Sequence, residues 1–278
     1  MIGVLSWYLF SLVLAVVNLP LAFAAMKKLP SRGIFLLRPL GLLLWGAIFW
    51  WLTSIQLLRN DLASQATALM ILGVINLFVF SKIKREDFFG WIKENTHLLI
   101  RAEVIFLVGF SLMAIVRAAN PEIINTEKFM EMAFINAILK SPGFPPLDPW
   151  LSGYSISYYY FGYLLSAMLI RITGVSSSVG YNLVSAFWFG LTAVGAYGIL
   201  WDLLCLRQQG TKKTHVVGFL QKNKAILALL APIMMLAMGN WFSGLDMIHA
   251  RGVLPQTAWE QLDIPKLTRE PFAMTIKP

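Results

Sequence analysis

Residues 39–81 read PLGLLLWGAIFWWLTSIQLL (39–58), RND (59–61) and LASQATALMILGVINLFVFS (62–81). A short charged link separates two uncharged apolar runs, and each run has roughly the 20 residues that cross a hydrocarbon layer as a helix. Only helices and closed barrels satisfy their backbone hydrogen bonds inside lipid. The stretch therefore predicts a pair of consecutive transmembrane helices.

The rest of the chain repeats this pattern of apolar runs between charges. Hydrophobic residues make up 58% of the 278 residues and charged residues only 13%, about half the charged share of a soluble domain. Five further runs are Ile2–Met26, Leu98–Val116, Ser155–Ile172, Ser176–Leu200 and Ala225–Phe242. We therefore predict an all-α polytopic membrane protein with about seven spans.

The first run also resembles a signal peptide at one point, because Ala22-Phe23-Ala24 imitates a cleavage site. No basic residue precedes the run, and it is longer than the usual apolar core of a signal peptide. We expect a retained helix.

The orientation is predicted from Lys and Arg in the short connections. The segments 27–38 and 82–93 are both basic, which favours a cytoplasmic position for both, with the N-terminus and the segment 117–153 outside. The basic segment 207–224 disagrees, because counting seven spans places it outside. We keep the span count at this point, since the two earlier segments support it.

Two shorter segments are predicted to be helical. Ser81–Thr96 mixes aromatic and charged residues, as in a helix on the cytoplasmic interface, and Asn125–Leu139 precedes a proline-rich break. The expected organisation is an N-terminal three-helix addition (1–96), a transmembrane core with an acidic outside loop (97–242, loop 117–153) and a polar tail (243–278).

Several function classes are disfavoured by the sequence. It carries no P-loop and no G-x-G-x-x-G, H-E-x-x-H or G-x-S-x-G motif. The formal charge of +9 comes mostly from the connections between apolar runs, so we expect no nucleic-acid partner. Cys205 is the only cysteine and is interpreted as an apolar filler in a membrane helix.

The segment 117–153 concentrates the carboxylates. Glu127 and Glu131 are four residues apart, which places both on one face of a helix, and a solvated helix face explains that spacing as well as a site does. Asp148 lies among Pro145, Pro146 and Pro149. Such a stiff segment either positions Asp148 for chemistry or is a proline turn with an incidental acid.

Three consecutive tyrosines, Tyr158, Tyr159 and Tyr160, follow this segment. An aromatic belt at the lipid headgroups explains some of them. Three in a row exceed what anchoring needs, and hydroxyls that face the protein can bind a phosphate or a sugar.

A resemblance to a known family rests on NPEI (120–123), TEKFMEMAFINAIL (126–139) and FPPLDPWLSGYSISYYYFGY (144–163). These stretches resemble the YYY family of archaeal and Chloroflexi membrane proteins, a family of unknown function named for its triple tyrosine. The stretches at 38–60, 180–193 and 239–245 also look like pieces of that family. The family more often carries Asp at the position of Glu131, and its members continue past this C-terminus, so we expect the chain to be an N-terminal portion.

The resemblance implies a function, because the layout of the family is similar to that of membrane glycosyltransferases of the GT-C type. Such an enzyme, or its N-terminal half, would act on a polyprenyl-phosphate-linked sugar at the outer face. Asp148, Glu127 and Glu131 would be the base or metal ligands and would converge on one cavity. Arg117 and Lys128 would hold phosphate, beside Tyr158, Tyr159 and Tyr160.

The resemblance also bears on cofactors and partners. A divalent cation is compatible with this chemistry, although the sequence names no metal. The expected partners are membrane lipid, the polyprenyl-phosphate donor and a separately encoded C-terminal half. The alternatives are a transporter or lipid-binding membrane module, marked by ionisable residues near mid-membrane, and a non-catalytic assembly subunit.

Overall fold

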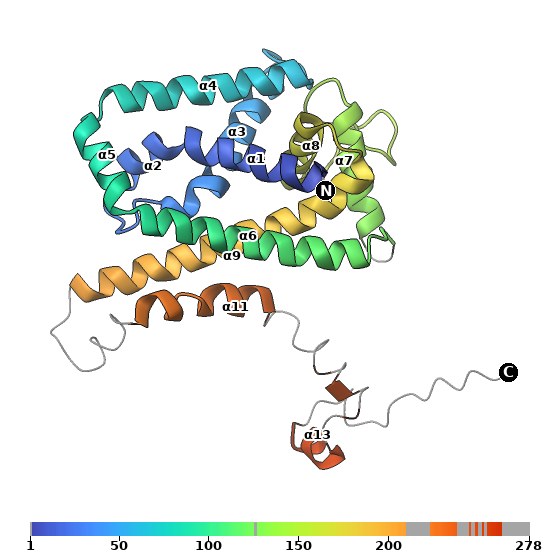
Figure 1. The fold of residues 1–278 in the computed structure, drawn as a ribbon. Coiled ribbons are helices and arrows are strands. Elements are labelled where there is room, and N and C mark those ends of the chain that lie inside the picture. Colours follow the sequence, from blue (N-terminus) through green and yellow to red (C-terminus); the bar gives the residue numbers. More distant parts are fainter. Residues whose placement is uncertain are drawn as a thin grey trace. The chain divides into compact units, whose positions relative to one another are not determined.

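A computed structural model describes residues 2–124, 127–209 and 223–237, with scattered residues between 245 and 262. The chain divides into two compact units, Met1–Pro232 and Ile233–Pro278. The first unit contains the long apolar helices (Figure 1). In the second unit, the short helix α13 (Gln256–Leu262) places the buried Trp259 edge-on against His249.

The regular secondary structure of the described residues in the first unit is helical, and a single bridge between Leu147 and Ser155 is its one strand-like pairing. The helices in chain order are α1 (Ile2–Val17), α2 (Leu19–Ala25), η1 (Ile34–Leu36), α3 (Leu37–Ser54), α4 (Leu62–Ser81), α5 (Arg85–Glu94), α6 (Thr96–Ala119), α7 (Lys128–Lys140), α8 (Phe161–Thr173) and α9 (Ser177–Gln209). Helix α11 (Leu230–Ala237) follows at the boundary between the units.

Four helices of the described chain are long and apolar enough to cross a membrane. They are helix α3 with η1, and helices α4, α6 and α9; the bent pair α1 and α2 makes a fifth candidate. The all-α membrane class is thus confirmed. The expected number of about seven spans is not, because α8 and the helix 223–237 are shorter apolar helices, and residues 238–242 of the last expected span lie outside the described residues.

The bend between α1 and α2 has a local cause. The two helices meet at 44°, next to Pro20, which has no backbone N–H to donate. Side chains bond to the backbone around the bend: the Leu21 N–H donates to Asn76 Oδ1 of α4 at 3.1 Å, and Asn18 Nδ2 donates at 2.8 Å to the Leu14 carbonyl, which also accepts from the Asn18 N–H at 3.2 Å. Both asparagines are buried, and Asn18 Oδ1 has no hydrogen-bond partner among the described residues.

Helices α6 and α9 form the most extensive helix pair of the bundle, and they run antiparallel (Figure 1). Arg117 near the end of α6 binds Asn182 near the start of α9, and a Cβ added to Gly109 would lie 3.2 Å from the Gly190 Cα. Such small residues allow close contact between membrane helices. We call the end of the bundle with Arg117, Asn182 and α7 the α7 end, and the opposite end the α5 end.

This antiparallel pairing decides how α8 runs. The chain leaves α6 at the α7 end and enters α9 at the same end. A single crossing of the membrane between them would bring α9 to the opposite end, so α8 is not a single transmembrane span. With 13 residues, α8 spans only about 20 Å. Its residues Leu164–Ile170 are all buried, so it is an apolar helix enclosed at the α7 end. The expected fifth span, Ser155–Ile172, is therefore not a single crossing.

Because α8 is not a span, the end of the bundle at which α9 ends differs from the one expected. Asp202 of α9 accepts hydrogen bonds from the Ser31 N–H at 2.8 Å and from the Ser31 hydroxyl at 2.7 Å. Lys224 lies 5.2 Å from the centre of the Trp201 ring. The end of α9 and Lys224 thus lie at the α5 end with Ser31 and the first basic segment. The two described ends of the segment 207–224 are therefore not on the side of 117–153, as was expected; residues 210–222 lie outside the described residues.

The N-terminal helices are not separate from the rest of the bundle. Trp7 of α1 packs edge-on against Phe187 of α9 at 5.6 Å, and Trp45 of α3 donates to the Gln65 carbonyl of α4. Both tryptophans are fully buried. The expected segment 1–96 and the first part of 97–242 therefore share one core within the unit Met1–Pro232.

The predicted short helix within Ser81–Thr96 is present as α5. It carries Glu86 and Asp87 in its first turn and Lys93 in its last, the order that the helix dipole favours. Phe88 is its buried residue and packs edge-on against Phe23 at 5.3 Å.

Candidate functional site

Helix α7 is the predicted helix of the acidic segment, with the bounds Lys128–Lys140; residues 125 and 126 lie outside the described residues. It buries Phe134, Ile135 and Ile138. Its last turn is anchored from other elements: Asn60 Nδ2 donates to the carbonyls of Ile138 at 2.5 Å and of Ser141 at 2.7 Å. These are carbonyls that a helix C-terminus leaves without internal partners.

Arg171 of α8 completes this anchor. It donates to the Leu139 carbonyl at 2.8 Å and to Asn60 Oδ1 at 2.7 Å. A cation at the negative end of a helix dipole is favourable. Arg171, which the sequence placed near the end of a span, therefore fixes the position of α7.

Glu131 points from the first turn of α7 toward α9, where its carboxylate accepts a hydrogen bond from the Tyr181 hydroxyl. The pair lies at a pocket of about 290 Å³. The pocket is lined by Glu131, Ile135, Tyr159, Gly162, Tyr163, Ser166, Tyr181, Val184, Ser185 and Trp188. One carboxylate, several hydroxyls and aromatic rings thus share one small cavity, which we call the Glu131 pocket.

Two of the three consecutive tyrosines belong to the rim of this region. The Tyr158 hydroxyl donates to the Tyr159 hydroxyl at 2.6 Å, and the Tyr158 ring lies 5.6 Å from the ring of Phe134 on α7. This hydrogen bond raises the pKa of the exposed Tyr158 to about 12, with a smaller contribution from the charge of Glu127. Tyr158 therefore stays neutral at physiological pH and can donate or accept a hydrogen bond.

Tyr160, the third tyrosine, faces elsewhere. Its hydroxyl accepts a hydrogen bond from Trp50 Nε1 of α3 at 2.9 Å, and its ring lies 6.3 Å from that of Phe144. Consecutive residues point in different directions, as the sequence implies. The structure thus divides the triple tyrosine between the region around α7 and helix α3.

Asp148 lies on the other side of α7. Its Oδ1 accepts hydrogen bonds from the N–H groups of Trp150 at 2.8 Å and Leu151 at 2.9 Å. It lines a second pocket, of about 370 Å³, with Ala133, Asn136, Ala137, Lys140, Ser141, Leu147 and Pro149.

The α7 residues of this second pocket are on the opposite face from Glu131 and Ile135, at 100° per residue. The expected convergence of Asp148 with Glu131 in one cavity is therefore not what the structure shows. The reason is the rotation of α7 about its axis, which a sequence spacing does not specify between separate elements. In the structure, Asp148 organises its own turn.

The remaining predicted residues lie around the α7 end. Glu127 is the exposed residue that precedes α7, and Lys128 is the first residue of the helix. Arg117 donates through Nε to Asn182 Oδ1 at 2.8 Å and through a terminal nitrogen to the Glu122 carbonyl at 3.3 Å. Its side chain is thus held against α9 by neutral partners.

No group of three or more His, Cys, Asp or Glu side chains in the part of the chain that the structure describes is arranged to hold a metal ion. Glu131 is the carboxylate of the Glu131 pocket, and Asp148 that of the second. The described residues therefore offer hydrogen-bonding groups in these pockets rather than a cage of anionic ligands.

Sequence reasoning missed Tyr181 and Asn182, which hold Glu131 and Arg117. Both lie in GYNLVSAFWFGLTA (180–193), a stretch that carries part of the resemblance, so the signal was available. It did not indicate which helix these residues face.

A second polar cluster, far from α7 in the sequence, was also missed. One terminal nitrogen of Arg38 on α3 donates to both carboxylate oxygens of Glu103 on α6, at 2.6 and 2.8 Å, and the Arg38 Nε donates to Ser11 of α1 at 3.2 Å. Its guanidinium lies 4.4 Å from the centre of the Phe106 ring. The sequence placed Arg38 in a basic loop and Glu103 near a span end. The structure joins them inside the bundle.

Comparison with known proteins places the chain in a family. A family profile described as "Uncharacterized membrane protein (DUF2298)" matches residues 44–266. No curated protein and no solved structure matches the chain. The match covers helices α4 to α9 and most of α3, including both pockets, and it agrees with the apolar helices of the bundle. The chain therefore belongs to the DUF2298 family of uncharacterized membrane proteins.

Proposed function

We propose that the chain is a glycosyltransferase-like membrane protein that acts at the α7 end on a polyprenyl-phosphate-linked sugar, alone or with a partner chain. The observation that carries the proposal is the Glu131 pocket. Its rings, including Trp188 and Tyr159, offer flat apolar faces, and its hydroxyls offer hydrogen bonds. A mainly apolar cavity with a few placed polar groups is the usual form of a small-molecule site.

The proposed chemistry uses Glu131 as the base. Its carboxylate takes the proton of an acceptor hydroxyl, and the acceptor oxygen forms a bond to the anomeric carbon of the sugar. The bond from that carbon to the phosphate oxygen breaks, and the phosphate leaves with the electron pair. Tyr181, which donates to Glu131, orients the carboxylate for this transfer.

The phosphate needs a cation, and Arg117 is the candidate on α6. It contacts Asn182, the neighbour of Tyr181 in α9. A guanidinium matches phosphate geometry with two parallel hydrogen bonds. Lys128, at the start of α7, is a second candidate for this role, and Asp148 stays a candidate for binding the acceptor in the second pocket.

The test is sugar transfer by the purified full chain in liposomes, with polyprenyl-phosphate mannose and polyprenyl-phosphate glucose as probes. Glu131→Gln keeps the shape of the side chain and removes the base, so transfer should fall by about 10²–10⁴. Glu122→Gln, at an exposed position outside the pocket, is the matched control and should transfer normally. Unchanged transfer by Glu131→Gln would exclude the proposed base.

The alternative of a transporter or lipid-binding module is favoured by one observation, the ion pair of Arg38 with Glu103. Ionisable residues inside a membrane bundle commonly mark a substrate or ion path. Absence of transfer by wild-type protein, combined with Glu103-dependent proton or solute movement into liposomes, would support this alternative. Absence of both activities would favour a non-catalytic assembly subunit.

A further inference from the structure

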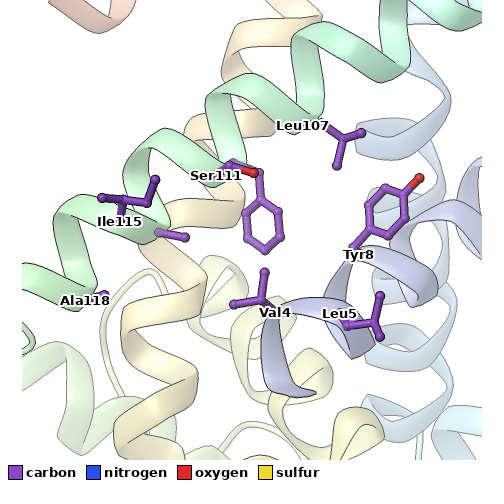
Figure 2. A pocket seen from close by; sticks show the side chains of 9 residues that line it. Val4, Leu5, Tyr8, Leu107, Ser111, Ile115 and Ala118 are labelled. Atoms are coloured by element: carbon purple, nitrogen blue, oxygen red, sulfur yellow. The ribbon is translucent and has the colours of Figure 1, made fainter. Parts of the chain in front are cut away.

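A groove of about 520 Å³ runs between α1 and α6, away from both pockets around α7. Figure 2 shows Val4, Leu5 and Tyr8 of α1 facing Leu107, Ser111 and Ile115 of α6 across it. Its other lining residues are Phe110, Ala114 and Ala118. Tyr8 and Ser111 alone among the nine lining residues have a polar side-chain atom, so the groove suits a hydrocarbon.

The surface around the groove is equally apolar. Leu5 is 56% exposed and Ile115 68%, and Val108 and Leu112 on the same helix are also exposed. A continuous apolar surface of this kind on a membrane helix faces lipid chains rather than water. We infer that the groove holds one hydrocarbon chain of an anionic membrane lipid, whose phosphate binds Arg117.

The length of the groove fits a lipid of a single leaflet. Leu107 and Ala118 mark its ends along α6, and their eleven-residue separation is about 16 Å. Half of a hydrocarbon core is about 15 Å. At the inner end of the groove the Tyr8 ring lies near Leu107 (Figure 2).

The outer end of the groove supplies the charge. Arg117 precedes Ala118, the last lining residue of α6. Its hydrogen-bond partners Asn182 and the Glu122 carbonyl are neutral. Between described residues, an ion pair joins Arg38 and Glu103, and none forms at Arg117. No described carboxylate therefore neutralises Arg117. A cation at the headgroup end of an apolar groove is complementary to a lipid phosphate.

The lipid site and the proposed transfer reaction share Arg117 as a phosphate ligand, and otherwise they rest on different residues. Helix α1 lies outside the residues that the family profile matches, and the groove shares no lining residue with the Glu131 pocket. It is tested by lipid retention alone, so its failure and that of the transferase proposal are distinguishable.

The experiment is native mass spectrometry of the purified full chain with equal amounts of phosphatidylglycerol and phosphatidylcholine of identical acyl chains. Wild-type protein should retain phosphatidylglycerol preferentially. Ser111→Trp fills the groove and should lower retention of both lipids about tenfold, whereas Leu112→Trp, on the exposed neighbouring position outside the lining, should leave it unchanged. Arg117→Gln should lower the ratio of retained phosphatidylglycerol to phosphatidylcholine about tenfold, because it deletes a charged hydrogen bond.

Three results would overturn the inference. Ser111→Trp with wild-type retention means that the chain binds elsewhere, and a preference that survives Arg117→Gln removes the assigned headgroup contact. Displacement of the lipid by millimolar inorganic phosphate alone would assign Arg117 to free phosphate. A dimer that Ser111→Trp dissociates would assign the groove to a second copy of the chain.

Discussion

The ion pair between Arg38 and Glu103 should be a principal source of stability in the bundle, and Glu103→Gln tests this. The Arg38 side chain is 6% exposed and that of Glu103 28%. The substitution removes the negative charge and leaves the Arg38 guanidinium buried without a counter-ion. Removing one partner of a buried pair costs about 3–5 kcal/mol. The partial exposure of Glu103 places the expected loss at the lower end, about 3 kcal/mol.

The assay is reversible unfolding in mixed micelles, followed by tryptophan fluorescence as the fraction of denaturing detergent rises. Glu94→Gln, at an exposed position of α5, is the matched control and should change stability by less than about 0.5 kcal/mol. The pair is then isolated by a double-mutant cycle with Arg38→Met and Glu103→Leu. Replacement of both partners by apolar residues of similar volume is often close to neutral.

The reasoning predicts that each single change is costly and that the double variant recovers most of the loss, with a coupling of about 3 kcal/mol. If the losses of the two single variants simply add in the double variant, the contact between Arg38 and Glu103 contributes nothing. The same result would remove the physical basis for treating the cluster as an intramembrane site.

The remaining predictions concern orientation, a tyrosine pKa and the anchor of α7. In a Cys205→Ser background, Lys28→Cys and Arg207→Cys should both resist an impermeant thiol reagent in intact cells, while Lys140→Cys is labelled. Labelling of only one of Lys28→Cys and Arg207→Cys would contradict their shared position at the α5 end. Tyr158 should titrate near pH 12, because its hydrogen bond with Tyr159 stabilises the neutral form; absorbance at alkaline pH should show a value nearer 10 in Tyr159→Phe, and an unchanged titration would refute the cause. Since the pKa is raised on folding, its stabilising effect is present below pH 10 and lost as the pH rises through 12. Asn60→Ala should lower stability by about 1–3 kcal/mol by leaving the buried carbonyls at the end of α7 unpaired, measured in the same micelle assay, and wild-type stability would show that these bonds are replaced.

Helices were predictable where the signal is local. The runs around Trp45 and Leu72 became α3 and α4 almost as expected, and Asn125–Leu139 became α7. Apolar length, caps and proline breaks act within a few residues. Helix α8 shows the limit of this reasoning, because its composition is that of a span while its position is set by where α6 ends and α9 begins.

The sequence by itself determined that this is an all-α membrane protein and that the segment around α7 carries Glu122, Glu127, Glu131 and Asp148. Only the tertiary structure decided that Glu131 meets Tyr181, 50 residues away, and that Arg38 meets Glu103, 65 residues away. It also separated Asp148 from Glu131. The physical reason is that such contacts depend on how each helix is rotated and which neighbour it packs against, and residue spacing along one segment carries no information about either.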